Sequence, residues 1–184
     1  MRGNKRSMND KHFRLSLVFI LLSCAICARG ESQLEALKMR KRFGVGVTAA
    51  GPLSVLGVEI DIHLNEVISV SGGLGTGLDY STFMLKGKYF LLGEKVSPYI
   101  GGGLARWWTD GTSEKNIGPN VLKNKFLSGN DYSQGFNVWM LYPALGVQYM
   151  HPQGIALYAE IQALIKIPTL ANGTYAGLGA LVYF

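Results

Sequence analysis

Residues 155–167 read Ile-Ala-Leu-Tyr-Ala-Glu-Ile-Gln-Ala-Leu-Ile-Lys-Ile, and every second residue from Ile155 to Ile167 is apolar. The polar side chains of this stretch all fall at the positions in between. They are Tyr158, Glu160, Gln162 and Lys166. Apolar and polar residues that alternate with period two predict a β-strand with two different faces. The run is longer than a typical strand of a soluble protein, which has about five or six residues.

The same alternation recurs through most of residues 42–184. It is clear in four more segments, which are 55–64, 82–91, 137–149 and 175–184. It is weaker in three others, which are 42–50, 67–79 and 98–108. Short turns connect most of these segments, whereas residues 109–135 form one long polar connection. The sequence therefore predicts an all-β fold, an eight-stranded antiparallel up-and-down barrel.

Two features predict that the apolar face points outward into a membrane. The predicted strands carry few charges, far fewer than the surface of a soluble protein. Aromatic residues also lie near the ends of the apolar face, as in the aromatic girdles of transmembrane barrels. These predicted membrane-interface residues are Phe83, Tyr89, Tyr99, Trp107, Trp139 and Tyr149. The alternative is a soluble barrel whose aromatics pack in its core, but such a barrel leaves the face of Ile155–Ile167 uncovered.

Over residues 42–184 the chain resembles the small bacterial outer-membrane β-barrels of the OmpA/OmpX type. The final strand ends at Phe184, with Val182, Ala180 and Leu178 on the same face. In that family such a terminal strand is the signal that the barrel-assembly machinery reads. The resemblance implies a transmembrane β-barrel located in the bacterial outer membrane, with outer-membrane lipid and lipopolysaccharide as its surroundings.

The first thirty residues predict a cleaved secretory signal peptide. Five basic residues precede the apolar run 15–22, and small residues follow it up to Gly30. The apolar stretch is too short for a spanning helix. Cleavage before Cys24 with lipidation of that cysteine is an alternative. We therefore expect export through the general secretory pathway, a short polar segment at 31–41 and a barrel domain at 42–184.

Removing residues 1–30 changes the charge of the chain. The net charge of +6 combines 18 basic and 12 acidic residues. Residues 1–30 hold six of the basic residues and one of the acidic residues. The remainder has 12 basic and 11 acidic residues, a net charge of +1. Both cysteines, Cys24 and Cys27, also lie in the leader. A nucleic-acid partner and thiolate metal sites are therefore not expected.

Charged residues on the polar face are expected to meet inside the barrel. An eight-stranded barrel has room for side chains but little more, and buried charges need partners. Counting from the predicted turns brings five of them to similar depth, and we predict one ion-pair network in the lumen. It comprises Glu59, Asp61, Lys86, Lys88 and Glu160. Other polar residues predicted to face the lumen are His63, Arg106, Gln162 and Lys166.

The sequence predicts no catalytic residue, metal site or cofactor. It lacks the G-x-S-x-G and H-E-x-x-H motifs, and His63 and His151 are expected at the end of the barrel that holds the chain termini. The favoured interpretation is a non-catalytic outer-membrane protein, structural or surface-interacting, with a side-chain-filled lumen. A narrow pore, or a transporter for small or apolar solutes, is the alternative. A lipid A-modifying enzyme is a third, and residues 109–135 are a candidate site for an unknown extracellular ligand.

Overall fold

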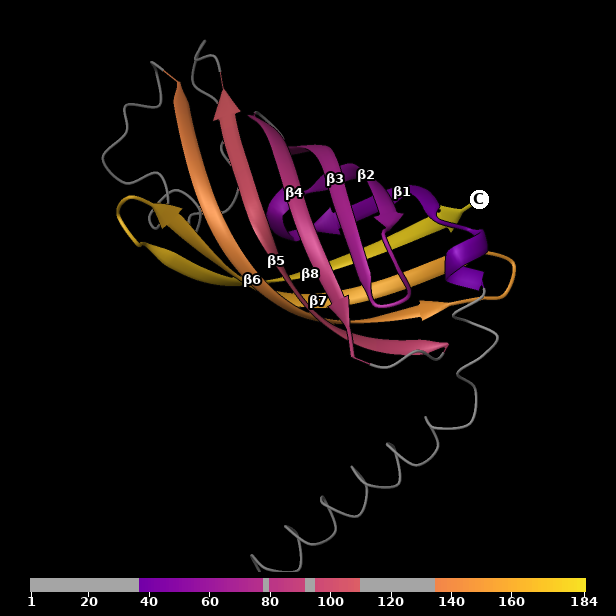
Figure 1. Ribbon diagram of the computed structural model, residues 1–184. Helices are drawn as coiled ribbons and strands as arrows, with labels where there is room; N and C mark the ends of the chain where they lie inside the picture. Colours follow the sequence, from indigo (N-terminus) through magenta and orange to yellow (C-terminus); the bar gives the residue numbers. More distant parts are fainter. Residues whose placement is uncertain (1–36, 78–79, 92–94, 110–134) are drawn as a thin grey trace, which may run out of the picture.

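The computed structural model describes residues 37–77, 80–91, 95–109 and 135–184. Eight strands form a closed barrel in which each strand pairs antiparallel with its neighbours in sequence and the last closes onto the first (Figure 1). The strands are β1 (Phe43–Ala50), β2 (Leu56–His63), β3 (Ile68–Gly77), β4 (Tyr80–Phe90), β5 (Val96–Thr109), β6 (Phe136–Met150), β7 (Ile155–Ile167) and β8 (Asn172–Tyr183). The expected eight-stranded antiparallel barrel is confirmed.

The two ends of the barrel differ in what they carry. The terminal end holds the start of β1, the end of β8 and the turns after β2, β4 and β6. The loop end holds the connections after β1, β3, β5 and β7. The signal peptide expected at 1–30 and nearly all of the long connection at 109–135 lie outside the described residues. Within the described part, no helix is long and apolar enough to cross a membrane.

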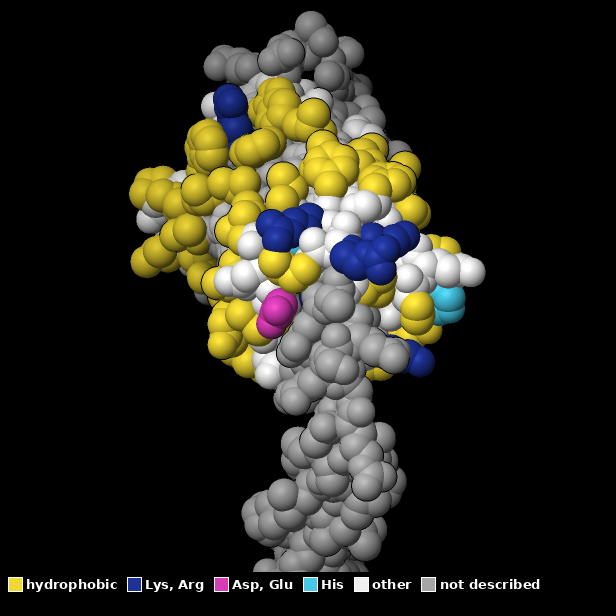
Figure 2. Space-filling view, turned by 45° about the vertical axis from the view of Figure 1, so that its right-hand side comes forward, with side chains coloured by type: hydrophobic (Ala, Val, Ile, Leu, Met, Phe, Trp, Pro, Cys, Tyr) yellow, Lys and Arg dark blue, Asp and Glu magenta, His cyan; other side chains and the backbone are white. Residues whose placement is uncertain are grey.

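Side chains alternate between the outside and the inside along the strands. In β7, Ile155, Leu157 and Ile161 are exposed, whereas Tyr158 and Glu160 are buried. Figure 2 shows hydrophobic side chains over much of the wall on the face in view. The outward face is therefore the apolar one, and the period-two pattern of the sequence is the reason.

Two groups of hydrophobic side chains pack inside the barrel. The apolar group lies toward the loop end. It comprises Leu53, Tyr80, Met84, Ala105, Trp107, Phe136, Val138, Met140, Tyr142, Ala144 and Leu164. A second group, rich in aromatics, lies toward the terminal end. It comprises Phe90, Tyr99, Met150, Ala156, Tyr158, Leu181 and Tyr183.

The connection between β1 and β2 folds into the loop end of the barrel. The sequence predicts a tight turn at Gly51-Pro52, but the structure has a buried 3₁₀ helix, η1 (Gly51–Leu53). The Trp107 indole N–H donates a hydrogen bond to the Pro52 carbonyl oxygen at 2.7 Å, and the Thr82 hydroxyl donates to the Leu53 carbonyl oxygen at 3.1 Å. Pairing between β1 and β8 stops at Ala50, which lies opposite Gly177. Residues 172–176 of β8 therefore extend beyond the end of β1, and η1 packs against β8.

A helical turn at residues 37–40 lies against the terminal end. Leu37 packs on the aromatic group, and the Lys38 side chain is 1% exposed. The Lys38 ammonium donates to the Glu66 carbonyl oxygen at 3.2 Å and lies 4.0 Å from the ring centroid of Phe90. Residues 37–41, expected as part of a polar segment before the barrel, thus contribute to its packing.

Candidate functional site

The five charged residues singled out by the sequence meet inside the barrel. The Lys86 ammonium lies 2.9 Å from Glu160 Oε1 and 3.5 Å from Glu59 Oε1. The Lys88 ammonium lies 3.0 Å from Asp61 Oδ1 and 3.4 Å from Glu59 Oε1. All five side chains are at most 2% exposed. We call these five residues the charge cluster.

Small residues on β3 allow β2 and β4 to share the charge cluster. The acids of β2 and the lysines of β4 lie on either side of β3, whose interior residues at this level are Ser69, Ser71 and Gly73. The Ser71 and Ser69 hydroxyls donate to Asp61 Oδ1 at 2.5 and 3.1 Å. The short side chains of β3 therefore leave the lysines a path to the acids and also solvate one carboxylate.

Each carboxylate of the charge cluster accepts a hydrogen bond from a tyrosine. Tyr183 donates to Asp61 Oδ2 at 2.6 Å, and Tyr99 donates to Glu160 Oε2 at 2.7 Å. Tyr158 donates to Glu59 Oε2. In every case one carboxylate oxygen faces a phenol and the other faces a lysine. Ion pairing and hydrogen bonding together offset part of the cost of removing these carboxylates from water.

Each of these tyrosines is paired across the sheet with a glycine. Tyr183 lies opposite Gly44, Tyr158 opposite Gly179, and Tyr99 opposite Gly146. A β-carbon added at any of these glycines would collide with the tyrosine ring. The glycines thus let the rings lie flat against the inner wall and reach the acids. These tyrosines were not predicted from the sequence, because the glycine opposite each one is recognised only once the strand pairing and register are known.

Two of the other polar residues expected in the lumen border the charge cluster. His63 is buried and stacks on Tyr183 with ring centroids 4.9 Å apart, and its Nε2 lies 4.0 Å from Asp61 Oδ2. The Gln162 amide donates to Glu160 Oε1 at 2.6 Å. Lys166 lies on the inward side of the β7 alternation, near the loop end, where it is partly exposed.

The predicted orientation of β5 is wrong. Tyr99 and Trp107, expected at the membrane interface, point into the barrel and are 1% and 2% exposed. Arg106, expected in the lumen, points outward, and its Nε donates to Asn137 Oδ1 at 3.0 Å. The alternation of this segment runs through Gly101–Gly103, which has no side chains to set its phase. An inward tryptophan is stable here because its N–H bonds the Pro52 carbonyl oxygen.

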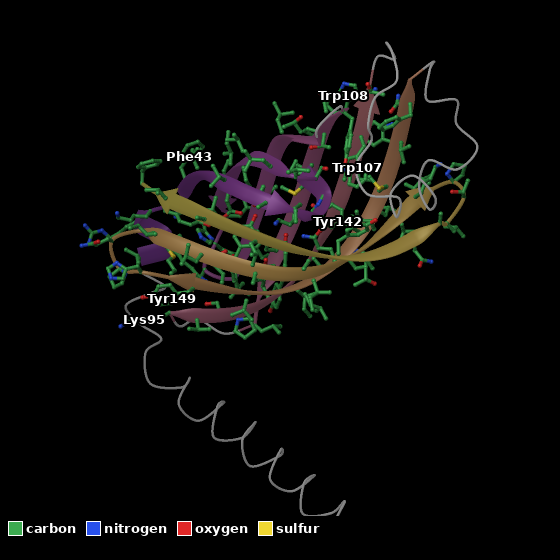
Figure 3. All side chains as sticks on the ribbon, turned by 180° about the vertical axis from the view of Figure 1, so that it is seen from behind. Phe43, Lys95, Trp107, Trp108, Tyr142 and Tyr149 are labelled. Carbon is green, nitrogen blue, oxygen red and sulfur yellow. The ribbon has the colours of Figure 1, made fainter. Side chains whose placement is uncertain are left out.

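The remaining aromatics of the predicted girdles lie on the outward face. Tyr89 and Tyr149 belong to the terminal end, whereas Phe83 and Trp139 lie toward the loop end. Figure 3 shows Tyr149 near the terminal end and Trp107 and Trp108 toward the opposite end. Phe184 is 65% exposed, and its backbone N–H donates to the Phe43 carbonyl oxygen at 2.9 Å.

The charge cluster offers ion pairing and packing rather than a coordination site. Its lysine ammonium groups occupy the space between the three carboxylates, and a cation entering there would meet two positive charges. Among the described residues, no group of three or more His, Cys, Asp or Glu side chains is arranged to hold a metal ion.

Comparisons with known proteins bear on the fold. No protein-family model and no curated protein matches the sequence. Among solved structures, the chain is similar to the N-terminal β-barrel domain of Pseudomonas aeruginosa OprF, with a TM-score of 0.55 and 15% sequence identity. The match covers 78% of this chain and 99% of that one. At this identity the similarity shows the shared eight-stranded barrel fold.

Proposed function

We propose that this chain is a non-catalytic barrel of the bacterial outer membrane, with a structural or surface-interaction role. The observation that carries the proposal is the distribution of polarity across the barrel wall. Large apolar side chains are exposed around the outside, while the charge cluster is buried inside. A soluble barrel has the opposite arrangement, and a wall of this kind in water would be an aggregation site.

The spacing of the outward aromatics supports a membrane-spanning barrel. Trp139 and Tyr149 stand ten residues apart on β6 and both face outward. Ten residues at about 3.3 Å each and a tilt of about 40° correspond to about 25 Å along the barrel axis, which is the height of the apolar band of such barrels. Residues 1–30 would then direct export through the general secretory pathway, and Phe184 would mark the last strand for the barrel-assembly machinery.

The filled interior favours a closed lumen over a narrow pore. The charge cluster fills the half of the lumen toward the terminal end, η1 covers the loop end, and residues 37–41 lie against the terminal end. Ions would have to break buried pairs to pass. Planar-bilayer recordings of the wild type and Lys86→Ala test this: we expect negligible conductance in the wild type, and ion-selective channels in it would establish the pore instead.

A lipid A-modifying enzyme has less support. His63 is buried beside Asp61, and His151 lies in the turn after β6, so both belong to the terminal end, away from the long connection. Mass spectrometry of lipid A from cells with and without the protein should show the same acyl pattern. A changed pattern would contradict a non-catalytic role. Protease shaving of intact cells would test whether residues 109–135 are exposed to extracellular ligands.

Membrane fractionation followed by gel electrophoresis tests the proposal as a whole. We expect the chain in the outer-membrane fraction and a change of mobility when the sample is boiled, because a folded barrel resists detergent. A chain that stays in the soluble fraction, with the same mobility before and after boiling, would refute a membrane-spanning barrel.

A further inference from the structure

Arg106 has an unusual position on the barrel wall. Among the strand residues that the structure describes, it is the one charged side chain on the outward face. The other charged strand residues lie on the inward side of the alternation. A charge on the lipid-facing side of a barrel is costly near the middle of the membrane and tolerated near its surfaces. An outward arginine is therefore expected near a membrane surface, where polar headgroups lie within its reach.

The Arg106 guanidinium is held in place by three neighbours. Its Nε donates to Asn137 Oδ1, and its Cζ lies 5.3 Å from the ring centroid of Trp108 and 5.4 Å from that of Trp139. Both indoles face outward, whereas the third tryptophan, Trp107, points into the barrel. No carboxylate among the described residues forms an ion pair with Arg106.

This arrangement leaves the terminal nitrogens of the guanidinium for a ligand. Asn137 accepts the hydrogen bond from Nε, and the indoles of Trp108 and Trp139 lie close to the guanidinium, so less side-chain freedom is lost when a ligand binds. Two parallel N–H donors match the oxygens of a phosphate group. The two nearby indole rings provide the mixed apolar and polar surroundings found where acyl chains meet lipid headgroups.

The depth of Arg106 fits the headgroup level. It pairs with Trp139 across β5 and β6, while Val96 at the other end of β5 pairs with Tyr149. Arg106 thus lies at the level of Trp139, near the loop end. Along the barrel axis this level is about 25 Å from that of Tyr149, which is the height of the apolar band of such barrels. The long connection 109–135 follows β5 at the same end, and long connections face outward in barrels of this kind.

We propose that Arg106, flanked by Trp108 and Trp139, binds the phosphate group of a phosphorylated glycolipid of the lipid A type in the outer leaflet. The proposal rests on the proposed function, because it requires the barrel wall to lie in a membrane. A lipid is the expected source of the phosphate, since the site stands on an apolar wall where the rest of a lipid can pack.

The test is a native mass spectrometry titration of the full chain, refolded in detergent micelles. Two ligands are compared, lipid A with its phosphates and the same lipid A after enzymatic dephosphorylation. We expect the wild type to bind the phosphorylated form about tenfold more tightly. Arg106→Gln, which keeps the side-chain length and removes the charge, should bind the two forms within about twofold of each other. Lys95→Gln removes a basic residue at the terminal end and should behave as the wild type.

Three results would overturn the site. They are a wild type that does not distinguish the two lipids, a preference that survives in Arg106→Gln, and displacement of the lipid by an equimolar amount of inorganic phosphate. The wild-type comparison does not depend on any variant folding. Insertion into vesicles, followed by the boiling-dependent mobility change, is measured on the same samples. A wild type that inserts but shows no lipid preference contradicts the phosphate site alone, whereas one that never inserts contradicts the proposed function and the site with it.

Discussion

The two halves of the barrel interior are stabilised by different interactions. The half toward the terminal end contains the charge cluster, its three tyrosines and their partner glycines. The half toward the loop end is apolar, and its polar contacts are mainly those that fasten η1. Packing of apolar side chains tolerates exchange of one residue for another of similar size. The charge cluster does not, because each member needs a specific partner.

The two halves of the interior therefore play different parts in specifying the fold. A slip of one residue between two strands would turn every inward side chain outward. In the terminal half such a slip would place charges on the apolar wall, which is far more costly than moving an apolar side chain there. We therefore infer that the charge cluster specifies the register of the barrel, while the apolar half adds cohesion.

The largest expected effect comes from breaking the charge cluster. Lys88→Met removes the ammonium that pairs with Glu59 and Asp61 and leaves two buried acids with less compensation. We expect the free energy of unfolding to fall by about 3–5 kcal/mol. Urea titration of the barrel in lipid vesicles, followed by gel mobility, measures the loss. The matched variant Lys88→Met with Asp61→Asn should recover part of it, and equal stability of the wild type and Lys88→Met would contradict a role for the cluster.

A cavity in the apolar half should cost somewhat less. Met140 is fully buried among the loop-end group, and Met140→Ala removes its packing without leaving a charge unpaired. We expect a loss of about 2–4 kcal/mol in the same urea titration, with the barrel still formed. Met140→Leu keeps the volume and should lose less than about 1.5 kcal/mol. A larger loss for Met140→Ala than for Lys88→Met would reverse the comparison between the halves.

Crowding a tyrosine should disturb the terminal half more mildly. Gly179→Ala places a methyl group against the ring of Tyr158, which must shift away from Glu59. We expect a loss of about 1–3 kcal/mol. Gly72→Ala is the control, because its methyl group would come no closer than 3.9 Å to another residue. Equal stability of the two variants would show that the cross-strand glycine does not position the tyrosine.

Loosening η1 should have the smallest effect. Trp107→Phe keeps an aromatic ring inside the barrel but removes the N–H that bonds the Pro52 carbonyl oxygen. Leaving that carbonyl unsatisfied should cost about 1–2 kcal/mol. Hydrogen exchange at residues 51–54 should speed up locally, while the strands stay protected. Unchanged exchange in this segment would show that the indole does not hold η1.

Period-two alternation was sufficient to predict most of the fold. It set the inward and outward faces correctly in β2, β4 and β7, where large side chains occupy nearly every position. It failed in β5, because Gly101–Gly103 cannot reveal the phase of the strand. The buried η1 was also missed, since a Gly-Pro pair predicts a turn without saying whether it points in or out.

The charge cluster could be predicted because its position follows from two quantities that the sequence provides. Strand face and distance from the nearest turn were enough to bring Glu59, Lys86 and Glu160 to one level. Its hydrogen-bond donors could not be found in the same way, because they depend on which strands are paired and on the space left by glycines opposite them. The packing of Lys38 against Phe90 was likewise visible only in the three-dimensional structure.

A membrane-spanning barrel is tested most directly by measuring whether the apolar wall lies in lipid. In a chain with Cys24 and Cys27 replaced by serine, a nitroxide label is attached at Leu145→Cys, an outward position on β6 that is 65% exposed. Its collisions with oxygen and with a water-soluble nickel complex are measured by electron paramagnetic resonance in lipid vesicles. For a barrel whose wall lies in lipid, we expect frequent collisions with oxygen and few with nickel. A label that meets the nickel complex as readily as one in water would contradict a membrane-spanning barrel.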